Sequence, residues 1–182
     1  MTRAFVAVVP PPAVLDAVDD AVTTISGSIP PGGRFTSRDQ HHLTLQFLGN
    51  HADVDAAGAA LEPLAVRRGD VRLGGAGAFP SPRHARVLWV GATEGAALLT
   101  QLAGAVGALL VPLGFEPESR PYHPHLTLAR WKSPTDVRGA VAAMSEQPLG
   151  PAWSADAIVV FESRLRREGA QYVARSVVPL AD

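Results

Sequence analysis

Hydrophobic and polar positions along the chain follow two different periods, which predict where strands and helices lie. Residues 4–9 are an uninterrupted apolar run, which is typical of a buried strand, and the three prolines that follow suit a turn into a helix. Apolar side chains recur at helical spacing over residues 13–25, and this segment ends at Gly27. Alternating polar and apolar residues over 42–48 predict a half-buried strand.

The rest of the chain continues as helices between pairs of strands, which indicates an α+β fold with mainly antiparallel sheets. Asp53 is expected to cap the second helix, and glycines at 74, 75 and 77 are interpreted as bulge or packing positions within a strand. Since no segment resembles an interdomain linker, we expect one domain over residues 1–182. Further strands are expected at 71–79, 85–90, 125–130, 153–161 and 171–178, and further helices at 53–66, 93–110 and 135–144.

Composition narrows the class of protein. Of 182 residues, 47% are hydrophobic and 18% are charged, which is typical of a globular chain. The net charge of −1 excludes a global polycation, so an anionic substrate needs a local site. The absence of cysteine excludes disulfides, thiolate metal ligands and a cysteine nucleophile. The first apolar run is too short for a signal sequence or a membrane span, so we expect a cytoplasmic protein.

One tetrapeptide occurs twice, once in each half of the chain. His-Leu-Thr-Leu begins at His42 and again at His125. Alternate side chains of a strand share a face, so each copy shows one histidine and one threonine (Thr44 or Thr127) on one side and hides two leucines on the other. Two such strands related by a pseudo-twofold axis would place two imidazoles and two hydroxyls around one cleft.

This set of groups has a chemical logic. Displacement at phosphorus needs a base on the attacking oxygen and an acid on the leaving oxygen, and two histidines can supply both near neutral pH. Threonine hydroxyls can bind the non-bridging oxygens, where charge accumulates. This chemistry requires no metal and no cofactor.

Strict alternation makes further assignments along the two strands. It places Gln46 on the histidine face, and it places His41 and Phe47 on the leucine side. It also places Arg130 with the leucines of the second copy, so a role for Arg130 in the cleft requires the strand to end or bulge there.

With their flanks, the two motifs resemble the 2H phosphoesterases, and the surrounding residues resemble the bacterial RNA 2′,3′-cyclic phosphodiesterase branch, also called LigT-like or 2′-5′ RNA ligase-like proteins. The resemblance extends along nearly the whole chain, and its two motif segments are the specific part. The similar segments are RAFVA at 3–7, HLTLQFLG at 42–49, the stretch 80–91 ending in VLWVG, YHPHLTLAR at 122–130, and FES at 161–163 with Gly169 and Tyr172.

The resemblance implies a role for each member of the quartet. His42 would donate a proton to the leaving ribose oxygen, and His125 would accept the proton of the attacking water. Thr44 and Thr127 would bind the phosphate. The implied reaction opens a 2′,3′-cyclic phosphate on RNA or a nucleotide to a 2′-phosphate, without a metal.

The resemblance also implies the fold and two further residues. The expected fold is bilobal, with two antiparallel sheets, outer helices and a pseudo-twofold axis through a central cleft. Arg130 would bind the phosphate or stack on the base. Phe5 is either a base-stacking residue or a core aromatic of the first strand. We expect a monomer that does not associate with membranes.

Several other interpretations stay open at this point. In a metal-dependent hydrolase, three or more imidazoles from the pairs His41–His42 and His123–His125 would have to converge, and no acidic residue lies close to either pair in sequence. A non-catalytic RNA-binding protein, a 2′-5′ RNA ligase and a small cyclic-nucleotide phosphodiesterase could use the same cleft. The arginines at 164, 166 and 167 are interpreted as a solvated turn or as a clamp on the RNA strand.

Overall fold

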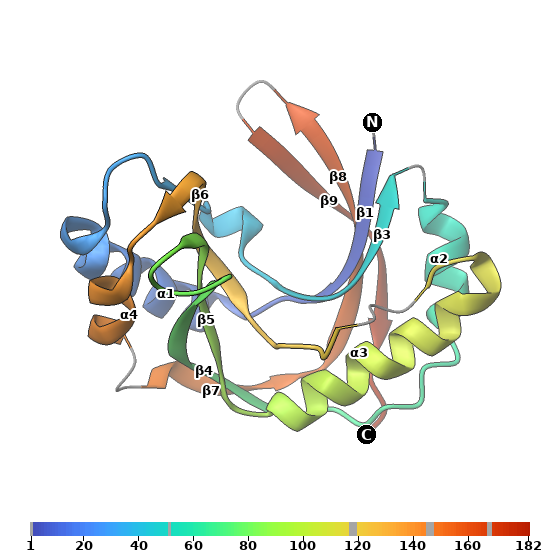
Figure 1. The fold of residues 1–182 in the computed structure, drawn as a ribbon. Coiled ribbons are helices and arrows are strands. Elements are labelled where there is room, and N and C mark those ends of the chain that lie inside the picture. The colour runs from blue at the N-terminus through green and yellow to red at the C-terminus, as the bar shows by residue number, and fades with distance from the viewer. Residues whose placement is uncertain (1, 51, 117–119, 145–147, 167–168) are drawn as a thin grey trace.

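The computed structural model describes residues 2–50, 52–116, 120–144, 148–166 and 169–182, and Figure 1 shows its helices outside a strongly curled sheet. Over these residues nine antiparallel strands follow the order β7-β4-β5-β6-β3-β1-β8-β9, with β2 paired to β6. The strands are β1 (Thr2–Val8), β2 (Arg34–Phe35), β3 (Leu43–Asn50), β4 (Gly69–Phe79), β5 (Ala85–Glu94), β6 (Leu126–Thr135), β7 (Pro148–Ala155), β8 (Ala157–Arg166) and β9 (Gly169–Pro179). The helices are α1 (Pro12–Ile25), α2 (Val54–Leu61), α3 (Ala96–Leu110) and α4 (Arg138–Met144).

The sheet divides into two lobes that meet between β3 and β6. We call β1, β3, β8 and β9 with α2 and α3 the first lobe, and β2, β4, β5, β6 and β7 with α1 and α4 the second lobe. In the first lobe α2 packs on β9 and α3 on β3, whereas in the second lobe α1 packs on β7 and α4 on β4. A single residue pair, Leu43 with Leu126, joins β3 to β6. The two sheets expected from the sequence are therefore the halves of one continuous sheet.

The helices form where the apolar spacing predicts them. Pro12 occupies the first turn of α1, and Val14, Val18 and Ile25 are buried on one side of it. The Asp53 side chain caps α2 by accepting a 3.0 Å hydrogen bond from the amide of Ala56, as expected.

Helix α3 is the most apolar helix of the chain. With the turn after it, Ala96–Leu113 is long and apolar enough to cross a bilayer by length and composition alone. In the fold it lies against the first lobe, with Leu99, Leu102, Val106 and Leu110 buried in the core. A helix of a globular protein also passes this test when its apolar side is buried against a sheet, as that of α3 is.

Several expected boundaries were wrong, among them the start of the last helix, which begins at Arg138 because β6 continues to Thr135. The second helix ends at Leu61 instead of continuing to residue 66. Helix α3 begins only after Gly95, whose φ of +78° favours glycine, because residues 93 and 94 still belong to β5. The expected strand 153–161 is interrupted at Asp156. Residues before Asp156 pair with β4 in the second lobe, and residues after it pair with β1 in the first lobe. The chain therefore crosses between the lobes at this residue.

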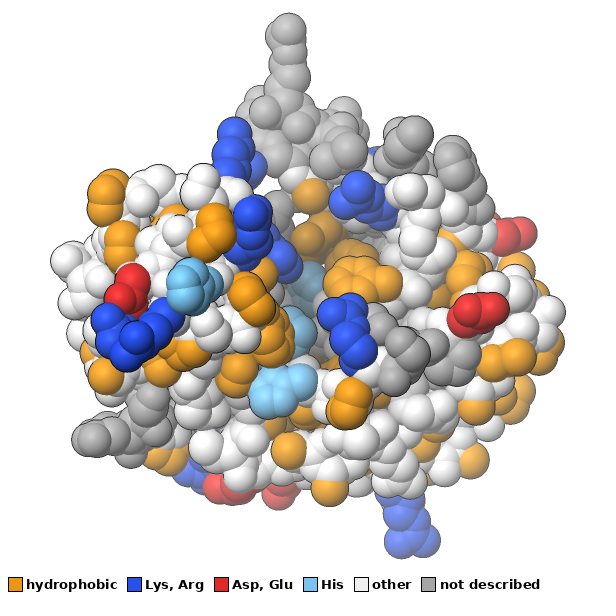
Figure 2. Space-filling view, viewed as in Figure 1, with side chains coloured by type: hydrophobic (Ala, Val, Ile, Leu, Met, Phe, Trp, Pro, Cys, Tyr) orange, Lys and Arg blue, Asp and Glu red, His pale blue; other side chains and the backbone are white. Residues whose placement is uncertain are grey.

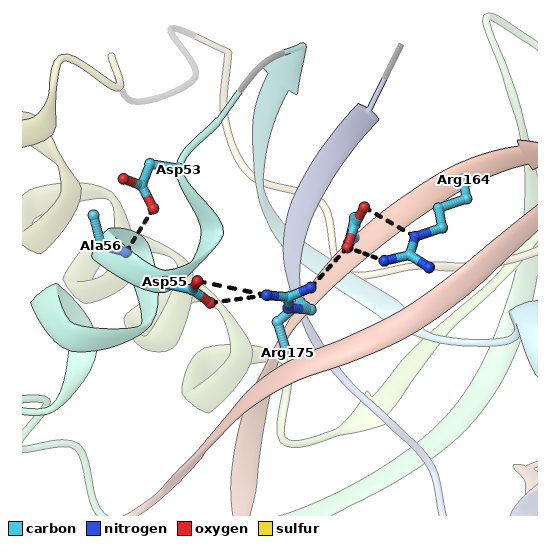
Figure 3. A network of polar contacts seen from close by, with 6 residues as sticks. Asp53, Asp55, Ala56, Arg164 and Arg175 are labelled. Atoms are coloured by element: carbon cyan, nitrogen blue, oxygen red, sulfur yellow. Dashed lines mark hydrogen bonds and ion pairs between the residues drawn. The ribbon is translucent and has the colours of Figure 1, made fainter.

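An ion-pair network attaches helix α2 to the β8–β9 hairpin (Figure 3). The Arg175 guanidinium contacts Asp55 of α2 at 3.2 Å and Glu162 of β8 at 3.2 Å. Glu162 also accepts two hydrogen bonds of 3.0 Å from Arg164. These guanidinium groups lower the pKa of the Glu162 carboxyl, the Arg164 hydrogen bond being the largest cause.

Candidate active site

The two histidines are held in the same way at the start of their strands. His42 immediately precedes β3, and its Nδ1 lies 2.7 Å from the carbonyl oxygen of Gln40. His125 immediately precedes β6, and its Nδ1 lies 2.8 Å from the carbonyl oxygen of His123. Since a carbonyl can only accept, Nδ1 carries the proton in both rings. Nε2 is therefore the reactive nitrogen of each neutral imidazole.

The two strands share a second feature, a β-bulge at the last leucine of each tetrapeptide. In the first lobe Ala7 pairs with Thr44 and Val6 with Gln46, so Leu45 has no partner in the pairing of β1 with β3. In the second lobe the pairing of β5 with β6 leaves out Leu128 in the same way. A bulge inserts one residue and reverses the parity of the residues that follow.

The bulges correct two assignments made from strict alternation and meet the condition set for a third. Gln46 is buried and donates to the carbonyl oxygen of Glu116 at 3.1 Å, whereas Phe47 faces the cleft and is 68% exposed. Gln46 was therefore wrongly placed beside His42, and Phe47 was wrongly placed in the core. In the second lobe the bulge at Leu128 turns the exposed Arg130 to the cleft side.

A single cavity of about 530 Å³ opens between the lobes and is lined by both histidine–threonine pairs. Figure 2 shows histidine side chains in this hollow and arginine or lysine side chains around it. Among the described residues no acidic side chain lines it, so the site has the charge that an anionic ligand needs. The lining residues are Arg3, Ala4, Phe5, Arg34, Phe35, Thr36, Gln40, His42, Thr44, Phe47, Gly49, His125, Thr127, Arg130, Ser163, Ala170 and Tyr172.

Each threonine hydroxyl lies beside another polar group of the cavity, Thr44 beside His42 and Thr127 beside Arg130. The Thr44 Oγ1 is 3.0 Å from Nε2 of His42, and because that nitrogen is unprotonated in the neutral ring, the hydroxyl donates. The Thr127 Oγ1 accepts a 3.3 Å hydrogen bond from the Arg130 guanidinium. A donor at each threonine and a cation at Arg130 suit the non-bridging oxygens of a phosphate.

Aromatic rings fix the position of His42. Phe5 stacks on the imidazole with ring centroids 4.5 Å apart, and Tyr172 contacts the imidazole edge-on at 5.3 Å. The Phe5 ring is 3% exposed and also stacks on Phe161 at 5.2 Å. Of its two sequence interpretations, the structure favours the core aromatic, because both ring faces are covered.

His125 has a different aromatic environment. Phe79 contacts it edge-on at 5.0 Å, and Trp89 lies 6.2 Å away. His123 packs on Trp89 at 4.5 Å and supplies the carbonyl that holds His125, so this residue supports the site through its backbone.

Burial keeps both imidazoles neutral in the free protein. It lowers the pKa of His42 to about 4, and the positive charge of Arg130 acts in the same direction. Burial is also the main reason why the pKa of His125 is lowered; the charge of Arg130 adds to this effect, and the hydrogen bond to the His123 carbonyl opposes it. An anion between the two histidines would favour their protonated forms instead.

Two other residues considered in the sequence, His41 and Arg164, do not line the cavity. His41 is 3% exposed and points away from His42, as alternation predicts. Among the described residues, no three His, Asp or Glu side chains form a metal-binding group. Arg164 pairs with Glu162, and the side chains of Arg166 and Arg167 lie outside the described residues.

Four lining or supporting residues were given no role in the site from the sequence. Phe47 was assigned to the core because the bulge has no local signal. Arg3, Tyr122 and Tyr172 belong to the segments that resemble the family, but nothing in their spacing connects them to the cavity. The Tyr122 hydroxyl donates to the carbonyl oxygen of Thr44 at 2.9 Å, which links the flank of the second motif to the first.

Solved structures share this fold over nearly the whole chain. A protein of Thermus thermophilus superimposes with a TM-score of 0.75 and 27% identity, covering 97% of each chain. The LigT protein of E. coli, crystallised with NADP+, superimposes with a TM-score of 0.76 and 25% identity, covering 100% of this chain and 98% of LigT. Fold and site together define a LigT-like protein with two histidine–threonine pairs around one cavity.

Sequence comparisons identify the family. Residues 10–167 match the model of the 2′-5′ RNA ligase superfamily, and the chain belongs to that superfamily. An RNA 2′,3′-cyclic phosphodiesterase of Archaeoglobus fulgidus is 30% identical over 151 residues, which are 81% of this chain and 84% of the relative. One of Aeropyrum pernix is 37% identical over 110 residues, which are 59% of this chain. The chain spans 62% of that relative and 56% of the Aquifex aeolicus one.

Proposed function

We propose that this protein hydrolyses a terminal 2′,3′-cyclic phosphate of RNA to a 2′-phosphate, with His42 as general acid and His125 as general base. The observation that carries the proposal is the symmetric pair of imidazoles, each with Nδ1 bonded to a backbone carbonyl, that line one cavity with two threonines. The curated relatives named above carry the same activity in their names.

The proposed reaction gives each of these groups a role. The oxygen of a water attacks phosphorus as Nε2 of His125 takes its proton, and the bond from phosphorus to O3′ breaks on the opposite side. The protonated Nε2 of His42 gives its proton to O3′, which leaves a 3′-hydroxyl and a 2′-phosphate. Thr44, Thr127 and Arg130 bind the non-bridging oxygens as charge builds on them.

The lowered pKa values of the histidines are compatible with these roles. A neutral His125 is ready to accept a proton at neutral pH. His42 has to be protonated to act as an acid, and the negative charge of the bound phosphate raises its pKa. Proton uptake should therefore accompany substrate binding.

The proposal is tested by turnover of oligoribonucleotides and mononucleotides that end in a 2′,3′-cyclic phosphate. His42→Ala and His125→Ala should each lower kcat by about 10²- to 10⁴-fold. His84→Ala, an exposed histidine outside the cavity, is the matched control. Near-wild-type turnover in either active-site variant contradicts the assignment.

Three further measurements separate this function from its alternatives. The product should be a 2′-phosphate, and a 3′-phosphate would reverse the assignment of acid and base. Activity should survive chelation by EDTA, and its loss would indicate a metal-dependent hydrolase. Tight nucleotide binding without turnover would indicate a binding protein. The reverse reaction, formation of a 2′-5′ linkage, uses the same groups with a ribose hydroxyl in place of water.

We also propose that the protein acts as a monomer in the cytoplasm.

A further inference from the structure

One end of the cavity holds an arginine that nothing in the quartet chemistry uses. Arg3 of β1 lines the cavity, and β1 and β8 place Ser163 directly opposite it. Within the described part of the chain, neither the Arg3 guanidinium nor the Ser163 hydroxyl has a hydrogen-bond or ion-pair partner. Both donors therefore face the same cavity end with unused capacity.

The backbone leaves this end open. Gly49 of β3 lies opposite Ala4 and lines the same end, and a Cβ added to it would meet no atom within 4 Å. The φ of Gly49 is +75°, a conformation that favours glycine, so the backbone conformation itself keeps this wall free of a side chain.

Among the described residues Arg3 has no carboxylate partner, whereas six other arginines pair with Asp or Glu. A guanidinium that faces a cavity without an acid is available for an external anion. The arginines that pair with Asp or Glu are Arg38, Arg68, Arg72, Arg138, Arg164 and Arg175.

Arg3 lies farther along the cavity wall than the reacting groups. It is two residues from Phe5 on the same face of β1, which corresponds to about 7 Å along the strand. Phe5 stacks on His42 at 4.5 Å, and the Phe47 ring lies 6.3 Å from Phe5. The 68% exposed ring of Phe47 therefore lies on the same cavity wall as His42 and Arg3.

We propose that Arg3 and Ser163 bind the 5′-phosphate of the terminal nucleotide, while the exposed ring of Phe47 supports its base. This inference rests on the proposed function, because it assumes that the 2′,3′-cyclic phosphate occupies the quartet. In an RNA strand that 5′-phosphate is the phosphodiester to the preceding nucleotide. The site thus selects RNA ends and 5′-phosphorylated nucleotides over nucleosides with a free 5′-hydroxyl.

The expected size of the selection follows from the chemistry of the contact. Charge-assisted hydrogen bonds from a guanidinium and a hydroxyl should raise kcat/KM by about 10- to 100-fold for a substrate that carries the phosphate. One phosphate neutralised on a single strand contributes about 0.7 to the slope of log affinity against log salt. Loss of Arg3 should remove both effects.

The experiment compares three substrates that share the same cyclic end. They are a nucleoside 2′,3′-cyclic phosphate with a 5′-hydroxyl, the same compound with a 5′-phosphate, and a short oligoribonucleotide. Wild-type protein should show a kcat/KM for the second and third about 10- to 100-fold above the first. Arg3→Gln should bring that ratio close to one and lower the salt slope on the oligonucleotide by about 0.7.

The control is Arg68→Gln, an exposed arginine of the far surface that pairs with Asp182 and does not line the cavity. It should keep the wild-type ratio. A wild-type ratio near one, or an unchanged ratio in Arg3→Gln, overturns the 5′-phosphate site while leaving the proposed hydrolysis intact. If wild-type protein turns over none of the three, the proposed function fails. The site is then tested by the Kd values of a nucleoside 2′-phosphate with and without a 5′-phosphate, and equal values overturn it.

Discussion

The hydroxyl of Tyr122 donates a 2.9 Å hydrogen bond to the carbonyl oxygen of Thr44, and so joins two segments that are 78 residues apart in the chain. In the described part of the chain, the strand pairing between β3 and β6 consists of one residue pair. The Tyr122 bond is therefore a second attachment between the strands that carry the two motifs, and it acts next to a phosphate-binding threonine.

Tyr122→Phe should weaken this attachment without leaving a hole, because only the hydroxyl is removed. We expect a loss of about 1 kcal/mol in the free energy of unfolding, measured by urea denaturation, and a lower kcat/KM. Tyr172→Phe makes the same chemical change and serves as the control for stability, since its hydroxyl has no hydrogen-bond partner among the described residues. Equal stability losses in both variants would argue against the attachment.

The buried His42 makes stability depend on pH. Burial lowers its pKa to about 4 in the folded protein, below the ordinary value of 6.5, so the unfolded chain binds more protons between these two values. The free energy of unfolding should thus fall as the pH drops from about 6.5 to about 4, by up to about 3 kcal/mol from this residue. The lowered pKa values of His41 and His125 act in the same direction.

Denaturation of His42→Gln across this pH range isolates the contribution of His42. The variant should lose less stability on acidification than wild-type protein, while His84→Gln should follow the wild-type curve. NMR titration of the His42 ring provides a direct check, with a midpoint near 4 in the free protein and a higher midpoint when inorganic phosphate is bound. An unchanged pH dependence in His42→Gln would show that another group is responsible.

Arg130 faces the cavity only because β6 bulges at Leu128. Arg130→Met should lower kcat/KM by about 10- to 1000-fold, since it removes the cation beside the phosphate-binding Thr127. Lys132→Met is the matched control, because Lys132 is exposed on the same strand and does not line the cavity. Comparable losses in both variants would point to a general effect of positive charge.

The network in Figure 3 predicts a stability effect away from the site. Arg175→Met removes the cation shared by Asp55 and Glu162, and the Glu162 side chain is only 11% exposed. The thermal midpoint should fall, and it should fall more than in Arg138→Met, where the broken pair with Asp136 is about half exposed on both sides. Activity on a small cyclic nucleotide should change little, since neither arginine lines the cavity.

Local patterns of the sequence predicted the features that depend on local chemistry. Helical spacing and the Asp53 cap gave α1 and α2, and the repeated tetrapeptide identified the pairs that line the cavity. Alternation holds as far as Thr44 and Thr127, because up to there each strand follows the regular pleat.

Features set by packing between segments were not predictable in this way. The bulges at Leu45 and Leu128 arise from the pairing of β3 and β6 with their neighbours, and nothing in the flanking residues marks them. The break at Asp156 lies within a continuing apolar pattern, so only the pairing partners on its two sides separate β7 from β8. The stacking of Phe5 on His42 likewise depends on the order of strands in the sheet.

The glycine at position 77 shows how the second lobe supports His125. A Cβ on Gly77 would lie 2.3 Å from the ring of Trp89, so the indole lies directly against the glycine backbone. Trp89 in turn packs on Phe79 and His123, which contact His125 or hold it. Any side chain at position 77 must therefore displace rings that surround the proposed base.

Gly77→Ala should lower both the free energy of unfolding and kcat, and Trp89 fluorescence should report the displaced ring. Gly104→Ala is the matched control, since Gly104 is exposed on α3 and a Cβ there meets nothing within 4 Å. That variant should instead gain about 0.5–1 kcal/mol from helix propensity, with unchanged kcat. The two substitutions add the same methyl group. Changes of opposite sign in the free energy of unfolding would therefore show that the Gly77 effect comes from contact with the indole and not from the loss of a glycine. Wild-type kcat in Gly77→Ala would mean that His125 does not depend on these rings.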